Sequence, residues 1–206
     1  ILQSQGYWVH GWRLGRNLGP TPDVVDGLID RLEDLHDRHA RPVSLIGWSL
    51  GGIYARRLAR KWPELVRQVI TLGSPFRITP DDRSAASALF DRLQPTHAIG
   101  LDELLPGFDA GPLTVPATAI YTRTDGVVRW WQCIEQTGAQ AENIEVRGSH
   151  SGLGFNAAAI YAISDRLAQP QDDWRPFRPP MCTRQLFPHP ADWRPGLTDK
   201  RAAALV

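Results

Sequence analysis

The sequence predicts an α/β protein with a mostly parallel sheet and helices on both faces. Short apolar segments with strand character alternate with longer segments whose apolar residues repeat at helical spacing, and most connections between them are short. Alternation of this kind is typical of parallel sheets, whose ligand sites lie at the carboxyl ends of the strands. The 206 residues are 42% apolar, which is enough for one domain with a continuous core.

The first helix has clear sequence boundaries. Thr21 provides a hydroxyl N-cap, Pro22 suits the first helical position, and Asp23 places an acid in the first turn. Apolar residues then repeat at helical spacing, which predicts an amphipathic helix that ends near His39. Before this helix, residues 7–10 predict a short strand.

The alternation continues to about residue 170, with one interruption. Residues 77–112 are irregular and form either a small lid or an ordinary excursion with its own helix. Residues 127–134 are expected to be a loop or a short helix. The other predicted strands are 43–47, 66–72, 115–122 and 143–147, and the other predicted helices are 50–61, 84–93 and 156–167.

The most informative stretch is Gly-Trp-Ser-Leu-Gly at residues 47–51, which joins an apolar strand to a helix. In this context the pentapeptide predicts a nucleophile elbow, a sharp turn that holds Ser49 in strained geometry at the tip of the sheet. The N–H of Leu50 would then point to where an oxyanion forms. The alternative is a glycine-rich loop with an incidental serine.

Three glycines fit this turn. At Gly47 and Gly51 we expect a Cβ to collide with neighbouring backbone, and Gly52 should let the helix pack tightly against the strand.

An acid and a histidine follow the serine along the chain. Asp125 and His150 each come just after a predicted strand, so both belong near Ser49 at one edge of a parallel sheet. His150 can take the serine proton and return it to the leaving group, while Asp125 fixes the imidazole tautomer. Each also has an interpretation without catalysis: Asp125 could be only a turn residue, and His150 only a loop residue. The rival acids, all in the irregular segment, are Asp102, Glu103 and Asp109.

Three tryptophans near these residues are candidates for an apolar substrate pocket. Trp48 precedes the serine, and Trp130 and Trp131 follow the acid loop. Packing in the core or on the surface is the alternative for each of them.

Composition and charge give no support for nucleic-acid binding, membrane association or metal binding. A net charge of +1 gives no electrostatic case for nucleic acid or a membrane surface, and no apolar run is long enough to span a bilayer. The spacing of Cys133 and Cys182 leaves their pairing open, with two free thiols as the default. His36 and His39 are expected on the polar side of the first helix, and His10, His97 and His189 have no partner at metal-ligand spacing, so we predict no metal site. A soluble, cytoplasmic location is slightly favoured. The densest basic group, expected on a solvated helix face, is Arg56, Arg57, Arg60 and Lys61.

Four motifs occur in order along the chain: Gly-Trp-Ser-Leu-Gly-Gly at 47–52, Thr-Leu-Gly-Ser-Pro at 71–75, Tyr-Thr-Arg-Thr-Asp-Gly-Val-Val at 121–128, and Gly-Ser-His at 148–150. Together they resemble the α/β-hydrolase superfamily, in particular its compact bacterial lipase- and esterase-like members. The resemblance implies the α/β-hydrolase fold for a catalytic domain at residues 1–170, and serine-dependent ester hydrolysis without a cofactor. Residues 171–206 are then a Pro-rich tail, either extended over the domain or partly disordered.

One feature departs from this family. Its members take a second oxyanion N–H from a loop upstream of the elbow, and the chain offers only His10-Gly11 there. Too few residues separate Gly11 from Ser49 for the family's usual intervening elements. The comparison therefore implies that the oxyanion loop and first strands lie upstream of Ile1. Loss of one such donor costs roughly 10² to 10³ in rate.

The leading hypothesis is an esterase or lipase acting on a small-molecule or lipid ester of short to medium chain length. One alternative is an acyltransferase that uses the same acyl-enzyme. The other is a catalytically weak, hydrolase-like module that binds an apolar ligand.

Overall fold

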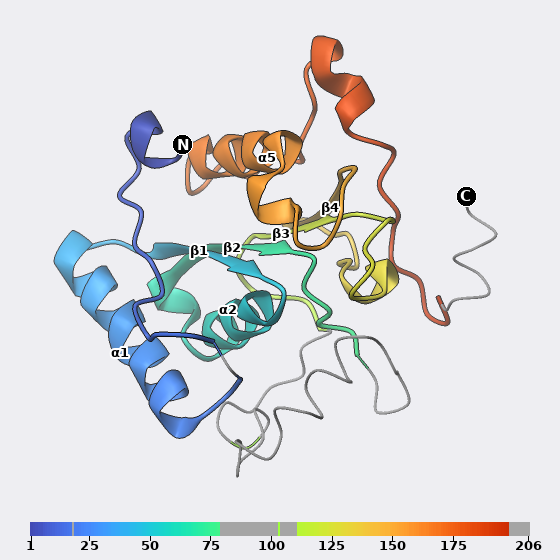
Figure 1. Cartoon of the computed structure of the whole chain (residues 1–206). Helices are drawn as coiled ribbons and strands as arrows, with labels where there is room; N and C mark the ends of the chain where they lie inside the picture. The colour runs from blue at the N-terminus through green and yellow to red at the C-terminus, as the bar shows by residue number, and fades with distance from the viewer. Residues whose placement is uncertain (18, 79–102, 104–110, 198–206) are drawn as a thin grey trace.

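The computed structural model describes residues 1–17, 19–78, 103 and 111–197, and its centre is a parallel sheet (Figure 1). The strands are β1 (Val43–Trp48), β2 (Val66–Leu72), β3 (Ala117–Tyr121) and β4 (Ala141–Glu145). The longer helices are α1 (Pro22–His39), α2 (Leu50–Lys61) and α5 (Ala157–Ala168). Short 3-10 helices are η1 (Gln3–Gln5), η2 (Pro63–Leu65), η4 (Trp130–Gln132), η5 (Leu153–Phe155) and η6 (Met181–Leu186).

The sheet order follows the chain order, β1-β2-β3-β4, and every neighbouring pair is parallel. All four carboxyl ends therefore lie at one edge of the sheet. The loops that leave this edge carry the serine after β1, a Gly-Ser-Pro turn after β2, the acid after β3 and the histidine after β4.

Helices cover both faces of the sheet, as the sequence predicts: α1 and α2 lie on one face and α5 on the other (Figure 1). Strand β2 supplies side chains to both cores because successive residues of a strand point to opposite faces. Val69 packs with α1 and α2, whereas Ile70 and Leu72 pack with α5.

Helix boundaries agree closely with those expected. Thr21 caps α1, where its Oγ1 accepts a hydrogen bond from Val24 N at 3.2 Å. Asn156 caps α5 in the same way, accepting from the N–H groups of Ala158 and Ala159. Strand β4 begins two residues earlier than predicted.

The predicted strand at residues 7–10 is not formed. A strand needs a neighbouring strand for its backbone hydrogen bonds, and this segment instead packs through its side chains on α1. Trp8 stacks on His39 with ring centroids 4.6 Å apart. The Nε2 atoms of His10 and His39 lie 3.1 Å apart. Burial and the nearby His39 lower the pKa of His10.

The basic group on α2 is solvated only in part, which corrects the expectation of a solvated face. Arg56 and Arg57 are buried, Arg60 is half-buried and Lys61 is exposed. Arg56 forms an ion pair with Glu135, donates to Gly111 O at 2.9 Å, and lies 3.9 Å from the ring centroid of Phe76. Sequence composition could not reveal these partners because all are distant along the chain.

The described part of the C-terminal tail, residues 171–197, packs along the outer side of β4. Phe177 N donates to Glu142 of β4 at 2.6 Å, and Ala191 N donates to the Tyr121 hydroxyl at 2.6 Å. Phe187 joins the core on the α5 face. Figure 1 shows this segment descending past β4 and η4.

Residues 79–102 and 104–110, which include most of the expected lid and the predicted helix at 84–93, lie outside the described residues. Among the helices that are described, none combines the length and the hydrophobicity needed to cross a membrane.

Candidate active site

The turn between β1 and α2 places Ser49 in a strained conformation. Its φ of 53° and ψ of −124° lie in a region that residues with a Cβ rarely adopt. The turn is fixed because Ser49 N donates to Leu72 O at the end of β2, at 2.9 Å, and Gly52 N donates to Ser49 O at 3.1 Å. These features confirm the expected elbow geometry.

Two of the three expected glycine constraints are present. A Cβ on Gly47 would overlap the backbone of Gly51 and Gly52, and a Cβ on Gly52 would overlap the Ser74 side chain. Gly51 differs from the expectation, since a Cβ there would meet nothing within 4 Å. Gly51 lines an open groove beside β1 and does not face the strand.

His150 and Asp125 are joined by a short hydrogen bond. Nδ1 of His150 lies 2.6 Å from Oδ2 of Asp125, and both side chains are more than nine-tenths buried. The other carboxylate oxygen, Oδ1, accepts from the N–H groups of Val127 and Val128, each at 2.8 Å. Asp125 is thereby held in one orientation. With Nδ1 as donor to the carboxylate, Nε2 is left as a proton acceptor.

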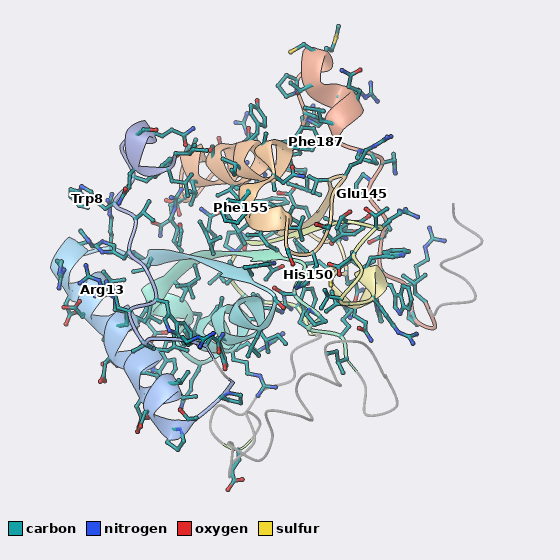
Figure 2. All side chains as sticks on the ribbon, viewed as in Figure 1. Trp8, Arg13, Glu145, His150, Phe155 and Phe187 are labelled. Atoms are coloured by element: carbon teal, nitrogen blue, oxygen red, sulfur yellow. The ribbon has the colours of Figure 1, made fainter. Side chains whose placement is uncertain are left out.

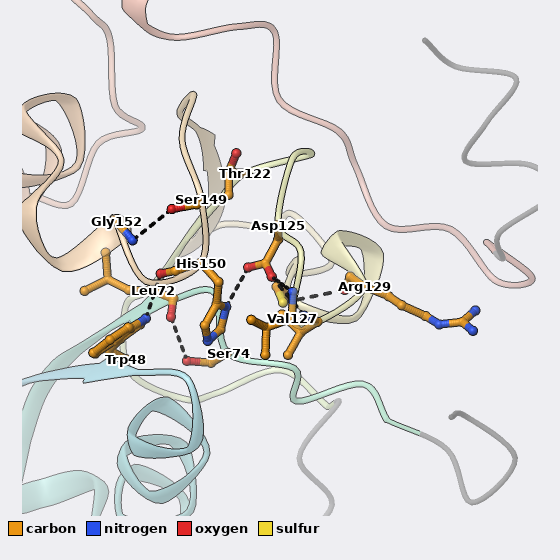
Figure 3. A network of polar contacts seen from close by, with 12 residues as sticks. Trp48, Leu72, Ser74, Thr122, Asp125, Val127, Arg129, Ser149, His150 and Gly152 are labelled. Carbon is orange, nitrogen blue, oxygen red and sulfur yellow. Dashed lines mark hydrogen bonds and ion pairs between the residues drawn. The ribbon is translucent and has the colours of Figure 1, made fainter. Parts of the chain in front are cut away.

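The end of β2, at Leu72 and Ser74, lies beside His150 (Figure 3). Gly73 follows Leu72, to which Ser49 is bonded, and has a φ of 52°. A Cβ on Gly73 would lie 3.2 Å from both His150 Nδ1 and Asp125 Oδ2. The structure thus gathers the three sequence-predicted residues at the carboxyl edge of the sheet.

Several solved structures are similar to this chain. One is a provisionally assigned non-heme bromoperoxidase, BpoC, from Mycobacterium tuberculosis, with a TM-score of 0.50 and 15% identity over 73% of this chain and 75% of that chain. An extracellular α/β-hydrolase from a Paenibacillus species has a TM-score of 0.47 and 16% identity, over 81% of this chain and 89% of that chain. A monoacylglycerol lipase from Paleococcus ferrophilus has a TM-score of 0.47 and 14% identity, over 68% of this chain and 75% of that chain. No protein-family model and no curated sequence matches.

The chain has the α/β-hydrolase fold. Within this hydrolase fold, two hydroxyls that the sequence analysis did not single out fix the histidine loop. Thr122 Oγ1 and Thr124 Oγ1 both donate to Gly148 O, at 2.9 and 2.6 Å. The sequence contains a signal for this role: Thr122 and Thr124 lie on either side of Arg123, just after a strand and just before the acid.

The indole of Trp48 lies beside the histidine. Trp48 Nε1 donates to the main-chain oxygen of His150 at 3.1 Å, and the two ring centroids are 5.9 Å apart. Figure 3 shows this bond on one side of His150 and Asp125 on the other. Trp48 remains 43% exposed.

The other two candidate pocket tryptophans lie in η4, which follows the acid loop. Trp130 is buried and stacks on Tyr121 with centroids 5.8 Å apart, and Trp131 meets it edge-on at 5.7 Å. Arg123 lies 4.7 Å from the centroid of Trp130. These contacts make Trp130 a packing residue of the core.

Burial shapes the electrostatics around the site. It raises the pKa of the Cys133 thiol well above its usual range, and the nearby Asp125 carboxylate adds to the shift. Cys133 and Cys182 are both free. Burial also lowers the pKa of Arg77, which follows the Gly-Ser-Pro turn, to about 10.

Of the rival acids, Glu103 is exposed, and Asp102 and Asp109 fall outside the described ranges. The residues that the structure describes contain no cluster of three or more His, Cys, Asp or Glu side chains arranged to hold a metal ion. A groove of about 770 Å³ runs along the outer edge of β1 and reaches the elbow at Gly47, Trp48 and Gly51.

Proposed function

We propose that this chain is a serine hydrolase that cleaves carboxylic esters through an acyl-enzyme, with Ser49, His150 and Asp125 as its triad. The observation that carries the proposal is the buried His150–Asp125 hydrogen bond of 2.6 Å beside a serine in elbow geometry. An imidazole oriented by a carboxylate, and a serine at the same edge of the sheet, are what nucleophilic catalysis by serine requires.

Acylation begins when Ser49 Oγ attacks the ester carbonyl carbon. His150 Nε2 takes the hydroxyl proton as the new C–O bond forms, and the carbonyl oxygen becomes an oxyanion near the N–H of Leu50, the first residue of α2. The intermediate then collapses. The bond to the leaving alcohol breaks, His150 returns the proton to that alcohol, and the acyl group stays on Ser49.

Deacylation repeats these steps with water. His150 takes a proton from water as its oxygen attacks the acyl carbon, and then gives that proton to Ser49 Oγ as the ester bond to the enzyme breaks. Asp125 stabilises the imidazolium in both halves and keeps its orientation, because two backbone N–H groups hold the second carboxylate oxygen. The cycle consumes one water per ester and needs no cofactor.

The proposed substrates are small-molecule or lipid esters of short to medium chain length, with Trp131 as a candidate apolar contact. Acyl transfer to an alcohol would use the same acyl-enzyme and differ only in the second attacking group.

The test is hydrolysis of p-nitrophenyl esters from acetate to palmitate by the chain and by Ser49→Ala. Activity that disappears in the variant supports Ser49 as nucleophile, and added acceptor alcohol with product analysis separates hydrolysis from transfer. Equal, background-level rates in both proteins would contradict the proposal and favour a hydrolase-like binding module.

A further inference from the structure

Trp48 joins the strand of the nucleophile to the loop of the general base. It is the last residue of β1 and directly precedes Ser49, and its Nε1 donates to the main-chain oxygen of His150 at 3.1 Å. We propose that Trp48 is a positioning residue, whose N–H holds the His150 loop in register with the elbow. This inference rests on the proposed function.

Three other hydrogen bonds to the histidine loop come from a different part of the sheet. Asp125 bonds to the His150 ring, and Thr122 and Thr124 bond to Gly148 O; all three follow β3. Strand β2 separates β3 from β1. Within the described residues, the Trp48 hydrogen bond is the direct one between this loop and the strand that carries Ser49.

The position of this hydrogen bond lets it affect the distance between the general base and the nucleophile. It ends on the main chain of His150 itself, so it fixes the peptide from which the imidazole projects. At its other end, Trp48 and Ser49 are consecutive, with Cα atoms about 3.8 Å apart. The indole therefore sets the separation of base and nucleophile, and a misplacement of about 1 Å can cost around 10² in rate.

A substrate-pocket role for Trp48 predicts different kinetics. A wall of the pocket binds ground state and transition state alike, so its loss would raise KM and change the preferred acyl chain length. A positioning residue acts on the approach of Nε2 to the hydroxyl, so its loss lowers kcat and leaves KM and the chain-length preference in place.

The test is Trp48→Phe, which keeps an aromatic ring and removes the N–H. We expect kcat for the preferred p-nitrophenyl ester to fall about 5- to 30-fold, the size of one lost positioning hydrogen bond, with KM changed less than about twofold. Trp8→Phe is the matched control, because Trp8 is 68% exposed and lies far from His150 (Figure 2); it should leave both constants unchanged.

A second measurement does not depend on hydrolysis. In the Ser49→Ala background, the proton between His150 Nδ1 and Asp125 should give a low-field NMR resonance because the hydrogen bond is short. Adding Trp48→Phe should broaden or shift this resonance through faster exchange, whereas adding Trp8→Phe should not.

The outcomes separate the two proposals. If no ester is hydrolysed but the resonance responds to Trp48→Phe, the proposed function fails and the positioning contact stands. If Trp48→Phe leaves kcat and the resonance unchanged, or acts only through KM and chain length, the positioning role is overturned.

Discussion

Gly73 lies against His150: a Cβ on Gly73 would be 3.2 Å from the imidazole Nδ1. The same Cβ would be 3.2 Å from Asp125 Oδ2 and 2.8 Å from a methyl carbon of Leu153, and the φ of 52° disfavours any side chain. The end of β2 therefore admits the acid–histidine pair only because this residue is glycine.

We expect Gly73→Ala to push the pair away from Ser49 and to lower kcat by at least about tenfold, since catalytic geometry is sensitive to shifts below 1 Å. Stability should fall by about 1 kcal/mol or more from backbone strain. Gly138→Ala is the control, because a Cβ at Gly138 meets nothing within 4 Å. Similar kinetics in both variants would show that this close approach is unimportant.

Asp125→Asn tests the role of the carboxylate with little change in shape. The asparagine amide can donate to Nδ1 and so stabilise the wrong tautomer, with the proton on Nε2. We expect kcat to fall by about 10⁴ at neutral pH, with KM little changed. Glu103→Gln is the matched control, because Glu103 is exposed. A loss below tenfold in Asp125→Asn, or an equal loss in both variants, would argue against Asp125 as the triad acid.

The two outer glycines of the elbow motif should respond in opposite ways to alanine. Gly47→Ala places a Cβ on the backbone of Gly51 and Gly52, so we expect loss of the folded elbow and of activity. Gly51→Ala meets open space inside α2 and should keep the fold, with a gain of about 0.5–1 kcal/mol from helix propensity. Thermal unfolding and ester hydrolysis of the two variants check this contrast, and equal damage from both would contradict it.

The C-terminal tail should contribute to the stability of the hydrolase fold. Phe187 is 8% exposed, belongs to the core beside α5, and contacts Phe177 with ring centroids 4.9 Å apart. We expect Phe187→Ala to lower the free energy of unfolding by about 3 kcal/mol. Met181→Ala in the same tail should change it by less than about 0.5 kcal/mol, because Met181 is 93% exposed. Urea unfolding measures both, and a small effect at Phe187 would mean that the tail is dispensable.

Local signals in the sequence were sufficient for the elements that begin and end at caps or prolines. Thr21 and Pro22 mark the start of α1, and Trp62-Pro63 follows directly after the last residue of α2. The segment at residues 7–10 has the composition of a strand, but strand formation depends on a partner strand, which no local pattern specifies. The high charge of α2 predicts a solvated Arg56. Its burial depends instead on contacts with Glu135 and Phe76, which are distant along the chain.

The same distinction applies to the site. Chain order and strand ends indicated Ser49, Asp125 and His150, because parallel strands bring their carboxyl ends together. The bonds that hold the histidine loop could not be predicted this way. Whether Trp48 faces substrate or the His150 carbonyl depends on the path of a loop about 100 residues later, which periodicity and propensity do not determine.

Cys133 should give the protein a pH-dependent stability at alkaline pH. Burial raises the pKa of its thiol in the folded state, so the unfolded chain loses this proton first as the pH rises past about 8.5. The stability contributed by the buried thiol is complete below that pH and is lost above it. We expect the free energy of unfolding to fall more steeply between pH 8 and 10 in the wild type than in Cys133→Ala, by up to about 1.4 kcal/mol per pH unit. Cys182→Ala should keep the wild-type slope, because Cys182 is exposed. If the free energy of unfolding depends on pH in the same way in Cys133→Ala and Cys182→Ala, then Cys133 ionises as readily in the folded protein as in the unfolded chain.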